Sequence, residues 1–105
     1  MTDPIVPLAR IRAAREVLEG RVHRTPMLGS CTAARAVEAA AGVRPADGRV
    51  HLKAEHLQKT GSFKARGALA RIAGLSAEER GRGVIAVSGG NAAQAYAWAG
   101  AQFGV

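Results

Sequence analysis

The sequence predicts at most one domain, with an α/β fold built on a parallel sheet, and three observations support this prediction. Segments with helical and with extended patterns alternate along the 105 residues. The run GVIAV, at residues 83–87, is continuously apolar and of strand length, which is typical of a parallel strand buried on both faces. It leads directly into SGGN, at residues 88–91, and then into an alanine-rich helical pattern.

The chain is expected to begin with a helix followed by an extended segment. Apolar residues after Pro7 recur every three or four positions, and Gly20 is a suitable place for this helix to stop. HRTPML, at residues 23–28, is expected to be extended, because the residue before Pro26 is pushed towards β geometry.

A second helix and a strand are expected next. Ser30 or Thr32 can cap an alanine-rich helix that ends at Gly42. VRPADG, at residues 43–48, is punctuated by proline, aspartate and glycine and is expected to be a surface loop. RVHLKAEHL, at residues 49–57, alternates apolar and polar residues, which predicts a strand.

The second half of the chain is expected to contain a helix, a short helix, the GVIAV strand and a last helix. Ser62 is a good N-cap, and the helix after it has one apolar face. SAEE, at residues 76–79, is a capping box that opens the short helix. AAQAYAWAGAQF, at residues 92–103, predicts the last helix, which Gly104 terminates. Because the chain stops at Val105, where the next parallel strand is expected, we expect the beginning of a longer fold.

Composition argues for a cytoplasmic protein without a membrane segment. No apolar run is long enough to span a bilayer, and the start, MTDPIVPLAR, lacks the basic end and apolar core of a secretory signal. Cys31 is the only cysteine, which excludes an intramolecular disulfide. His51 and His56 lie five residues apart in or beside a strand, so they point to opposite faces, and no metal site is expected.

The chain is basic, with 15 Lys and Arg against 8 Asp and Glu and a formal net charge of +7. Such an excess can mark a nucleic-acid surface. The arginines are scattered from Arg10 to Arg82, however, and no basic stripe interleaved with aromatic residues is visible. The sequence therefore favours a solvated basic surface and no nucleic-acid partner, and a non-catalytic anion-binding module remains the alternative of a different class.

The first stretch that could carry chemistry is KTGSFKARGALARI, at residues 59–72, in which Lys64 starts a helix. The helix dipole disfavours a cation there, and this position, partial burial and the neighbouring Phe63 would each favour a neutral, nucleophilic amine. Gly67 and Ala68, three and four residues on, share its face of the helix and leave room for a planar ligand. Spacing alone favours the simpler interpretation, in which Lys64 is solvated and Gly67 is a packing contact.

The second stretch is VSGGNAAQ, at residues 87–94, whose turn comprises Ser88, Gly89, Gly90 and Asn91. A buried strand that ends in this turn and opens a helix presents unpaired backbone N–H groups to an anion. Ser88 and Asn91 add directional hydrogen bonds, but neither a dinucleotide fingerprint nor a phosphate-binding lysine loop is present. An anion site and a tight turn capped by Asn91 explain the stretch equally well.

Together the two stretches closely resemble the pyridoxal-phosphate enzymes of fold type II, in particular the branch of threonine/serine dehydratases and serine racemases. LKAEHLQKTGSFKARGA, at residues 52–68, is similar to that branch's cofactor-lysine motif, and VSGGNAAQAYAWAG, at residues 87–100, to its asparagine loop and following helix. RTPML, at residues 24–28, with Ser30, matches the family's usual opening. The resemblance covers essentially the whole chain, and Arg-Gly-Ala after the lysine distinguishes it from the related cysteine and threonine synthases, which usually have Asp-Arg.

The resemblance implies the start of a three-layer parallel-sheet fold. About 1–73 would belong to the cofactor-lysine domain, and about 74–105 would begin the smaller domain with the asparagine loop. Pyridoxal 5'-phosphate is the implied cofactor, with Lys64 forming its Schiff base. Phe63 would pack against the pyridine ring, and Asn91 would hydrogen-bond the ring's phenolic oxygen.

The implied reaction is a β-elimination that converts L-threonine or L-serine into a 2-oxo acid and ammonia. Lys64 takes the α-proton, the cofactor ring accepts the electron pair, and the β-hydroxyl leaves. A small amino acid is thus the expected partner, and the complete protein is expected to be a homo-oligomer. The residues implied to bind the substrate are Ser88, Gly89, Gly90, Asn91 and Ala92.

Two departures from the family pattern bear on function. Gly89 stands where racemases of this group have a second serine as acid/base, so racemisation is the weaker alternative. Ala92 stands where the family usually has histidine, so any side-chain role is lost there.

The family's glycine-rich phosphate loop and the residue facing the pyridine nitrogen are not among these 105 residues. The chain by itself is therefore expected to bind the cofactor weakly and to turn over poorly or not at all.

Overall fold

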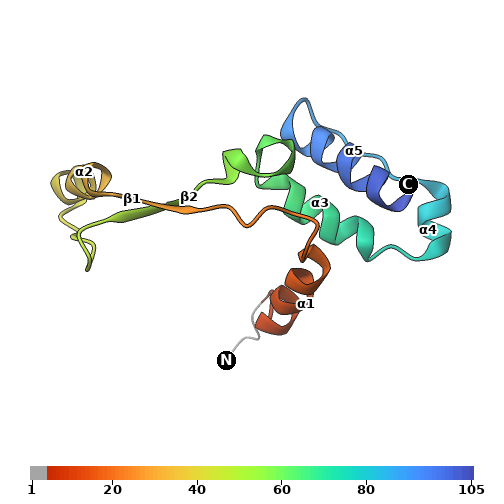
Figure 1. Cartoon of the computed structure of the whole chain (residues 1–105), viewed down its shortest axis with the longest axis horizontal. Coiled ribbons are helices and arrows are strands. Elements are labelled where there is room, and N and C mark those ends of the chain that lie inside the picture. Colours follow the sequence, from red (N-terminus) through yellow and green to blue (C-terminus); the bar gives the residue numbers. More distant parts are fainter. Residues whose placement is uncertain (1–4) are drawn as a thin grey trace. The chain divides into compact units, whose positions relative to one another are not determined.

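The fold is described by a computed structural model that covers residues 5–105; the part of the secretory-signal argument that falls on residues 1–4 lies outside the described residues. Helices and strands follow the predicted order for most of the chain (Figure 1). The elements are α1 (Leu8–Leu18), β1 (Met27–Ser30), α2 (Cys31–Ala41), β2 (Val50–Lys53), α3 (Lys64–Ala73), α4 (Ala77–Arg82) and α5 (Asn91–Phe103), with short 3-10 turns at Glu55–Leu57 and Lys59–Gly61.

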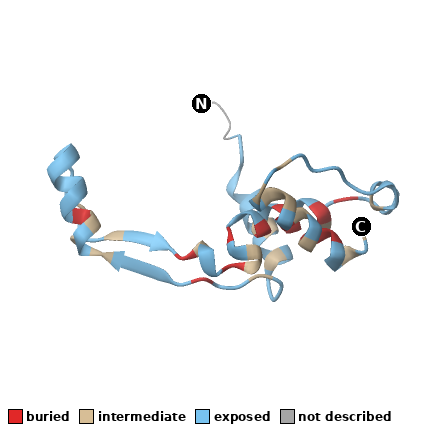
Figure 2. Ribbon diagram, turned by 90° about the horizontal axis from the view of Figure 1, so that it is seen from above, coloured by how far each residue is buried: buried red, intermediate tan, exposed pale blue. Residues whose placement is uncertain are grey.

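The chain divides into two compact units. The lysine unit comprises the described residues up to His23 together with His56–Val105, and the hairpin unit comprises Arg24–Glu55. Most buried residues belong to α3 and α5 of the lysine unit (Figure 2). The hydrophobic core of the described chain therefore lies in the lysine unit.

The hairpin unit contains β1 and β2, which pair antiparallel, with Ser30 opposite Val50. Helix α2 follows β1 without a loop, because the Ser30 hydroxyl accepts a hydrogen bond from the backbone N–H of Ala33 at 3.1 Å. The helix ends at Gly42, whose φ of 65° is in the left-handed region that glycine adopts without strain. Both predicted ends of this helix are confirmed.

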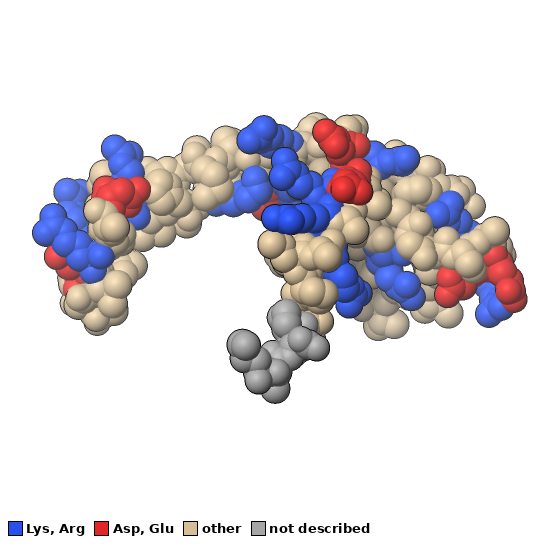
Figure 3. Space-filling view, turned by 90° about the horizontal axis from the view of Figure 1, so that it is seen from below, with Lys and Arg blue, Asp and Glu red and all other residues tan. Residues whose placement is uncertain are grey.

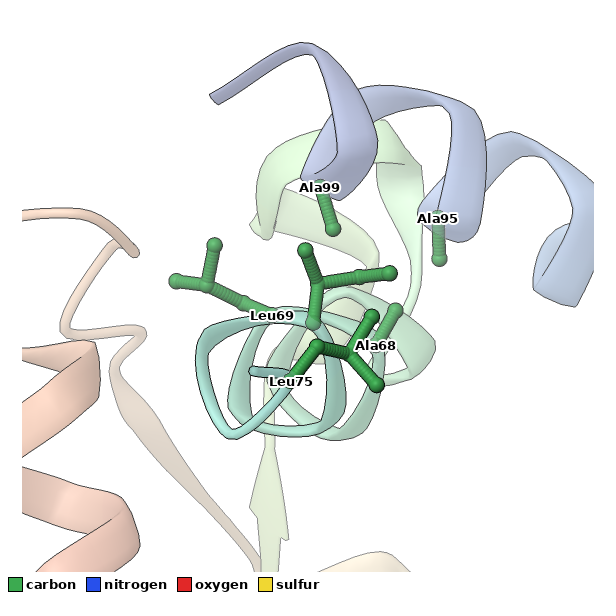
Figure 4. Packing of buried hydrophobic residues seen from close by; sticks show 6 residues of the cluster. Ala68, Leu69, Leu75, Ala95 and Ala99 are labelled. Atoms are coloured by element: carbon green, nitrogen blue, oxygen red, sulfur yellow. The ribbon is translucent and has the colours of Figure 1, made fainter. Parts of the chain in front are cut away.

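The core of the lysine unit forms where α3 and α5 lie side by side and run in the same direction (Figure 1). Leu69 and Ile72 of α3 are fully enclosed, with 0% exposure. Ala95 and Ala99 of α5 point towards α3 and Leu69, and the small alanine side chains let the two helices approach closely (Figure 4). The N-terminal ends of α3 and α5 consequently lie at the same end of the pair.

Local capping signals account for the other helix ends. Pro7 precedes α1, and Gly20, with φ 71°, follows its end, close to the predicted stop. The capping box of α4 is present, since the Ser76 hydroxyl accepts from the Glu79 N–H at 3.2 Å. In return, the Glu79 carboxylate accepts from the Ser76 N–H at 2.7 Å.

The prediction of a buried parallel strand at residues 83–87 is wrong for this structure. The segment carries no strand pairing in the part of the chain described, and Ile85 and Val87 are 97% and 98% exposed. A parallel strand needs a neighbour for its ladder hydrogen bonds and layers on both faces. No segment between residues 5 and 105 supplies either, so the apolar pattern is present without its burial.

Figure 3 shows how the basic side chains are distributed over one face. On the face shown in Figure 3, Lys and Arg lie in several groups separated by acidic and uncharged residues. Among the residues that the structure describes, no helix has the length and hydropathy needed to cross a bilayer.

Candidate active site

Lys64 is the first residue of α3, and the residues just before it fix where that helix begins. Ser62 is extended and 7% exposed, and its hydroxyl accepts from the Lys64 N–H at 3.4 Å. The regular helix starts at Lys64, one residue later than an N-cap at Ser62 predicts, although Phe63 already has helical dihedral angles. Ser62 nevertheless satisfies an N-terminal N–H of the helix.

Gln58 ties the turn before Lys64 to the loop after α1. Its buried side chain donates to the His23 carbonyl and accepts from the His23 N–H, both at 2.8 Å, and also accepts from the Lys59 N–H at 2.9 Å. Thr60 follows with φ 61°, an uncommon conformation for a β-branched residue. The approach to Lys64 is therefore held in a fixed, strained turn.

A hollow of about 330 Å³ lies between the N-terminal halves of α3 and α5, and we call it the Lys64 hollow. Helix α3 supplies the lysine and two small residues, the residue just before it supplies an aromatic ring, and α5 supplies two alanines and a tyrosine. The lining residues are Phe63, Lys64, Gly67, Ala68, Ala92, Ala95 and Tyr96.

The space beside Lys64 is not filled by packing. A Cβ placed on Gly67 would meet no atom within 4 Å in the described chain. The interpretation of Gly67 as a packing contact is therefore wrong, whereas the prediction that Gly67 and Ala68 clear space beside Lys64 is confirmed.

Lys64 is exposed, as the interpretation favoured by spacing alone predicts. Its side chain is exposed rather than partly buried, and its Nζ lies 5.0 Å from the centroid of the Phe63 ring, which is itself 60% exposed. Partial burial, which would have favoured the neutral amine, is therefore not observed between residues 5 and 105. The contact with Phe63 has cation–π geometry.

The SGGN turn lies immediately before the part of α5 that lines the hollow. The Ser88 hydroxyl accepts from the Gly90 N–H at 3.2 Å, and α5 begins at Asn91. Asn91 is exposed and makes no capping hydrogen bond, so the tight-turn interpretation holds through Ser88 and not through Asn91. Ala92 is the predicted substrate residue that shares the hollow with Phe63 and Lys64.

Ser88, Gly89, Gly90 and Asn91 are not in the wall of the Lys64 hollow. They precede Ala92 directly and lead into the N-terminus of α5, where the first backbone N–H groups of a helix have no intrahelical partner. Since α3 also begins at this end, the positive ends of two helix dipoles lie near one another. This arrangement favours an anionic group beside the hollow.

Three residues of this site were missed in the sequence. Ala95 and Tyr96 could have been found, because positions three and four after Ala92 share its face of a helix. Gln58 carries no such signal, because its hydrogen bonds join residues 35 positions apart. Among the described residues, no group of three His, Cys, Asp or Glu side chains is placed to hold a metal ion.

A lysine in the first turn of a helix, beside a hollow at the N-terminal ends of two packed helices, is the kind of site at which a protein binds a carbonyl-bearing cofactor covalently. Residues 18–105 match the family model described as pyridoxal-phosphate dependent enzyme. The chain therefore belongs to the family of pyridoxal-phosphate dependent enzymes.

Relatives and solved structures agree with this family. The chain is 44% identical over 101 residues to an L-threonine ammonia-lyase of Thermotoga maritima, covering 96% of this chain and 23% of that protein. It is 39% identical over 94 residues to a serine racemase of Dictyostelium discoideum, covering 90% and 26%. A threonine deaminase from the organism abbreviated T.th. superposes with a TM-score of 0.70 at 43% identity, covering 95% of this chain and 32% of that one.

A maize serine racemase also superposes with a TM-score of 0.70, at 36% identity, covering 90% of this chain and 27% of that one. These matches confirm the α/β class and the predicted family. The chain spans about a quarter of the length of the curated relatives it matches.

Proposed function

We propose that this chain is the part of a fold type II pyridoxal-phosphate lyase that carries the cofactor lysine, and that the enzyme deaminates L-threonine or L-serine by β-elimination. The observation that carries this proposal is the Lys64 hollow, which is lined both by Lys64 and by Ala92, the residue that follows the SGGN turn. Relatives named L-threonine ammonia-lyase and threonine dehydratase share 38–45% of their aligned residues with the chain.

The residues present fit the cofactor. The hollow of about 330 Å³ is within the range of small-molecule sites, roughly 300–1,000 Å³. It combines a primary amine with the Phe63 ring, and Gly67 leaves unfilled space beside them. When bound, pyridoxal phosphate supplies an electron sink for the bond broken at the substrate's α-carbon.

The chain's own residues would provide attachment, orientation and proton transfer. Lys64 holds the cofactor through its amine and, once released, takes the α-proton of the substrate. Phe63 would pack against the pyridine ring, and Asn91 would hydrogen-bond the ring's phenolic oxygen. Backbone N–H groups of the SGGN turn and of Ala92, together with Ser88, bind the substrate carboxylate, which the two helix N-termini also favour.

Serine racemase is the second candidate, because relatives and a solved structure carry that name. Racemisation needs a group that moves a proton on the opposite face of the substrate, and Gly89 has no side chain for this task. Formation of 2-oxobutyrate or pyruvate would favour the lyase, whereas D-serine from L-serine would favour the racemase.

The experiment uses the fact that the chain has three lysines, Lys53, Lys59 and Lys64. The chain is mixed with pyridoxal phosphate, reduced with borohydride and digested, and the adduct is located by mass spectrometry. We expect the adduct on Lys64 at cofactor concentrations that leave the other two unmodified. Lys64→Ala should abolish it, and Lys59→Ala, the matched control, should retain it. Equal labelling of all three lysines would contradict the proposal.

Further parts of the proposal depend on the same assignment. Four of them remain predictions. They are the boundary near residue 73 between the two parts of the catalytic domain, assembly into a homo-oligomer, a cytoplasmic location and the absence of a nucleic-acid partner. The described chain supplies one side of the cofactor site, so we expect weak cofactor binding and little turnover from these residues by themselves.

A further inference from the structure

Tyr96 brings the second polar side chain to the Lys64 hollow. All other lining residues except Lys64 are apolar or glycine, so the phenol and the amine are the two side chains there that can hydrogen-bond a ligand. Tyr96 is half-buried and packs against the core cluster around Leu69 and Ala95, which fixes the ring in place.

The hydroxyl of Tyr96 is available to a ligand. It makes no hydrogen bond within the part of the chain that the structure describes, and it is not among the polar atoms sealed from solvent without a partner, which are Thr60 Oγ1 and Arg80 Nε. A half-buried tyrosine normally finds a partner for its hydroxyl, so a ligand in the hollow is a natural one.

The position of Tyr96 on α5 directs it towards the start of that helix. Side chains on a helix lean towards its N-terminus and over the preceding turn, which for Tyr96 is the turn of Ala92. The methyl group of Ala92 leaves this space open. Tyr96 therefore lines the hollow one turn after Ala92, in the N-terminal half of α5, together with Lys64 of α3.

We propose that Tyr96 recognises the β-hydroxyl of the substrate and so restricts the hollow to β-hydroxy-α-amino acids; this inference rests on the proposed function. A neutral phenol suits a neutral hydroxyl, whereas the carboxylate is better matched by backbone N–H groups and helix dipoles. The methyl groups of Ala92 and Ala95 accept the apolar part of the side chain. A site that hydrogen-bonds a substrate hydroxyl discriminates against the analogue that lacks it.

The test compares L-threonine with L-2-aminobutyrate, which lacks only the hydroxyl, on the chain loaded with pyridoxal phosphate. Dissociation constants come from the absorbance change of the bound cofactor. We expect wild type to prefer L-threonine by about fivefold or more, as one neutral hydrogen bond provides. In Tyr96→Phe, the ratio of the dissociation constant for L-2-aminobutyrate to that for L-threonine should fall to about one, while the affinity for L-2-aminobutyrate stays unchanged. Trp98→Phe, a half-buried aromatic control in α5 that does not line this hollow, should keep the wild-type ratio.

The outcomes separate this inference from the proposed function. A Lys64 adduct with an unchanged ratio in Tyr96→Phe overturns the role of Tyr96 and leaves the proposed function standing. Equal weakening of both ligands shows that the ring is only structural and also overturns it. Absence of the Lys64 adduct in wild type overturns the proposed function, and the inference fails with it. Because Tyr96 is the only tyrosine, its ring signals in nuclear magnetic resonance should respond to L-threonine and not to L-2-aminobutyrate.

Discussion

Gly67 shows how a single residue separates a packing role from a functional one. A glycine inside a helix costs about 1 kcal/mol relative to alanine, so its presence needs a reason. Its dihedral angles are helical, and a Cβ there would touch nothing within 4 Å, so neither the backbone nor the packing of the described chain requires it. The reason left by the structure is the open space next to Lys64.

Gly67→Ala should therefore raise stability and lower cofactor binding together. We expect the free energy of unfolding to rise by about 0.5–1 kcal/mol, because the unfolded chain loses conformational freedom. The added methyl group narrows the hollow, so the yield of the Lys64 adduct should fall severalfold. Chemical denaturation and mass spectrometry measure the two effects.

The matched control for this variant is Gly81→Ala. Gly81 lies inside α4, and a Cβ there would likewise meet nothing within 4 Å, but it does not line the Lys64 hollow. The Gly81→Ala variant should be more stable than wild type and should give an unchanged yield of the Lys64 adduct. If Gly67→Ala also kept the full yield of the Lys64 adduct, the Lys64 hollow would not be the cofactor-binding site.

At this scale, the sequence was most informative where a signal is local. Ser30 and Ser76 were predicted as caps because each bonds an N–H three residues away, and both bonds are present. Gln58 was missed because its hydrogen bonds join it to His23, 35 positions away, and no spacing within one element reveals such a contact.

Among the elements, α4 is stabilised mainly by its ends. It has six residues, none of them buried, so hydrogen bonds and charges rather than burial hold it. Besides the capping box, Arg80 donates from Nη2 to the Ala73 carbonyl at 2.9 Å, and Arg82 pairs with Glu78 one turn earlier. A helix this short is marginal in isolation, so each end contact matters.

The capping box makes the start of α4 sensitive to acid. The Ser76 N–H donates to the Glu79 carboxylate and holds the pKa of that carboxyl below its usual value of 4.5. A carboxyl with a depressed pKa in the folded state stabilises it above the usual value, and this contribution is lost as the pH falls through the lowered pKa. We expect the protection factor of the Ser76 amide, measured by nuclear magnetic resonance hydrogen exchange, to fall below pH 4.5.

Glu79→Gln provides the comparison, because glutamine can still accept from the Ser76 N–H but does not titrate. In this variant, the Ser76 amide should be less protected than in wild type at neutral pH. Its protection should also not decrease further as the pH falls below 4.5. The effect is small, since Glu79 is on the surface. An identical acid transition in this variant would assign the titration to another carboxyl.

Elements also show where pattern reasoning fails. The helices were predicted well, since each closes its own backbone hydrogen bonds within consecutive residues. GVIAV has the pattern of a buried strand, but a strand depends on neighbours that the pattern does not specify. The sequence therefore revealed that residues 83–87 are suited to burial, and it could not reveal that nothing within the described chain covers them.

Across the whole molecule, large apolar side chains are divided between one small core and exposed positions. Leu69 and Ile72 are fully buried in the lysine unit, whereas Met27, Leu28 and Leu52 of the hairpin unit are about half exposed. Small domains bury a modest share of their surface, so their stability rests on few residues. Substitutions in the α3–α5 core should therefore dominate stability, and exposed apolar positions should instead govern association.

Ile85→Lys tests this division between stability and association. Ile85 is 97% exposed, so the free energy of unfolding should change by less than about 0.5 kcal/mol. A charge within an exposed, extended apolar run removes a template for intermolecular strand pairing, so light scattering should show less self-association at equal concentration. Ile72→Lys, at a position with 0% exposure, should unfold the chain because it buries an unpaired charge. Loss of folding in Ile85→Lys comparable to that in Ile72→Lys would mean that residues 83–87 pack against the core in solution.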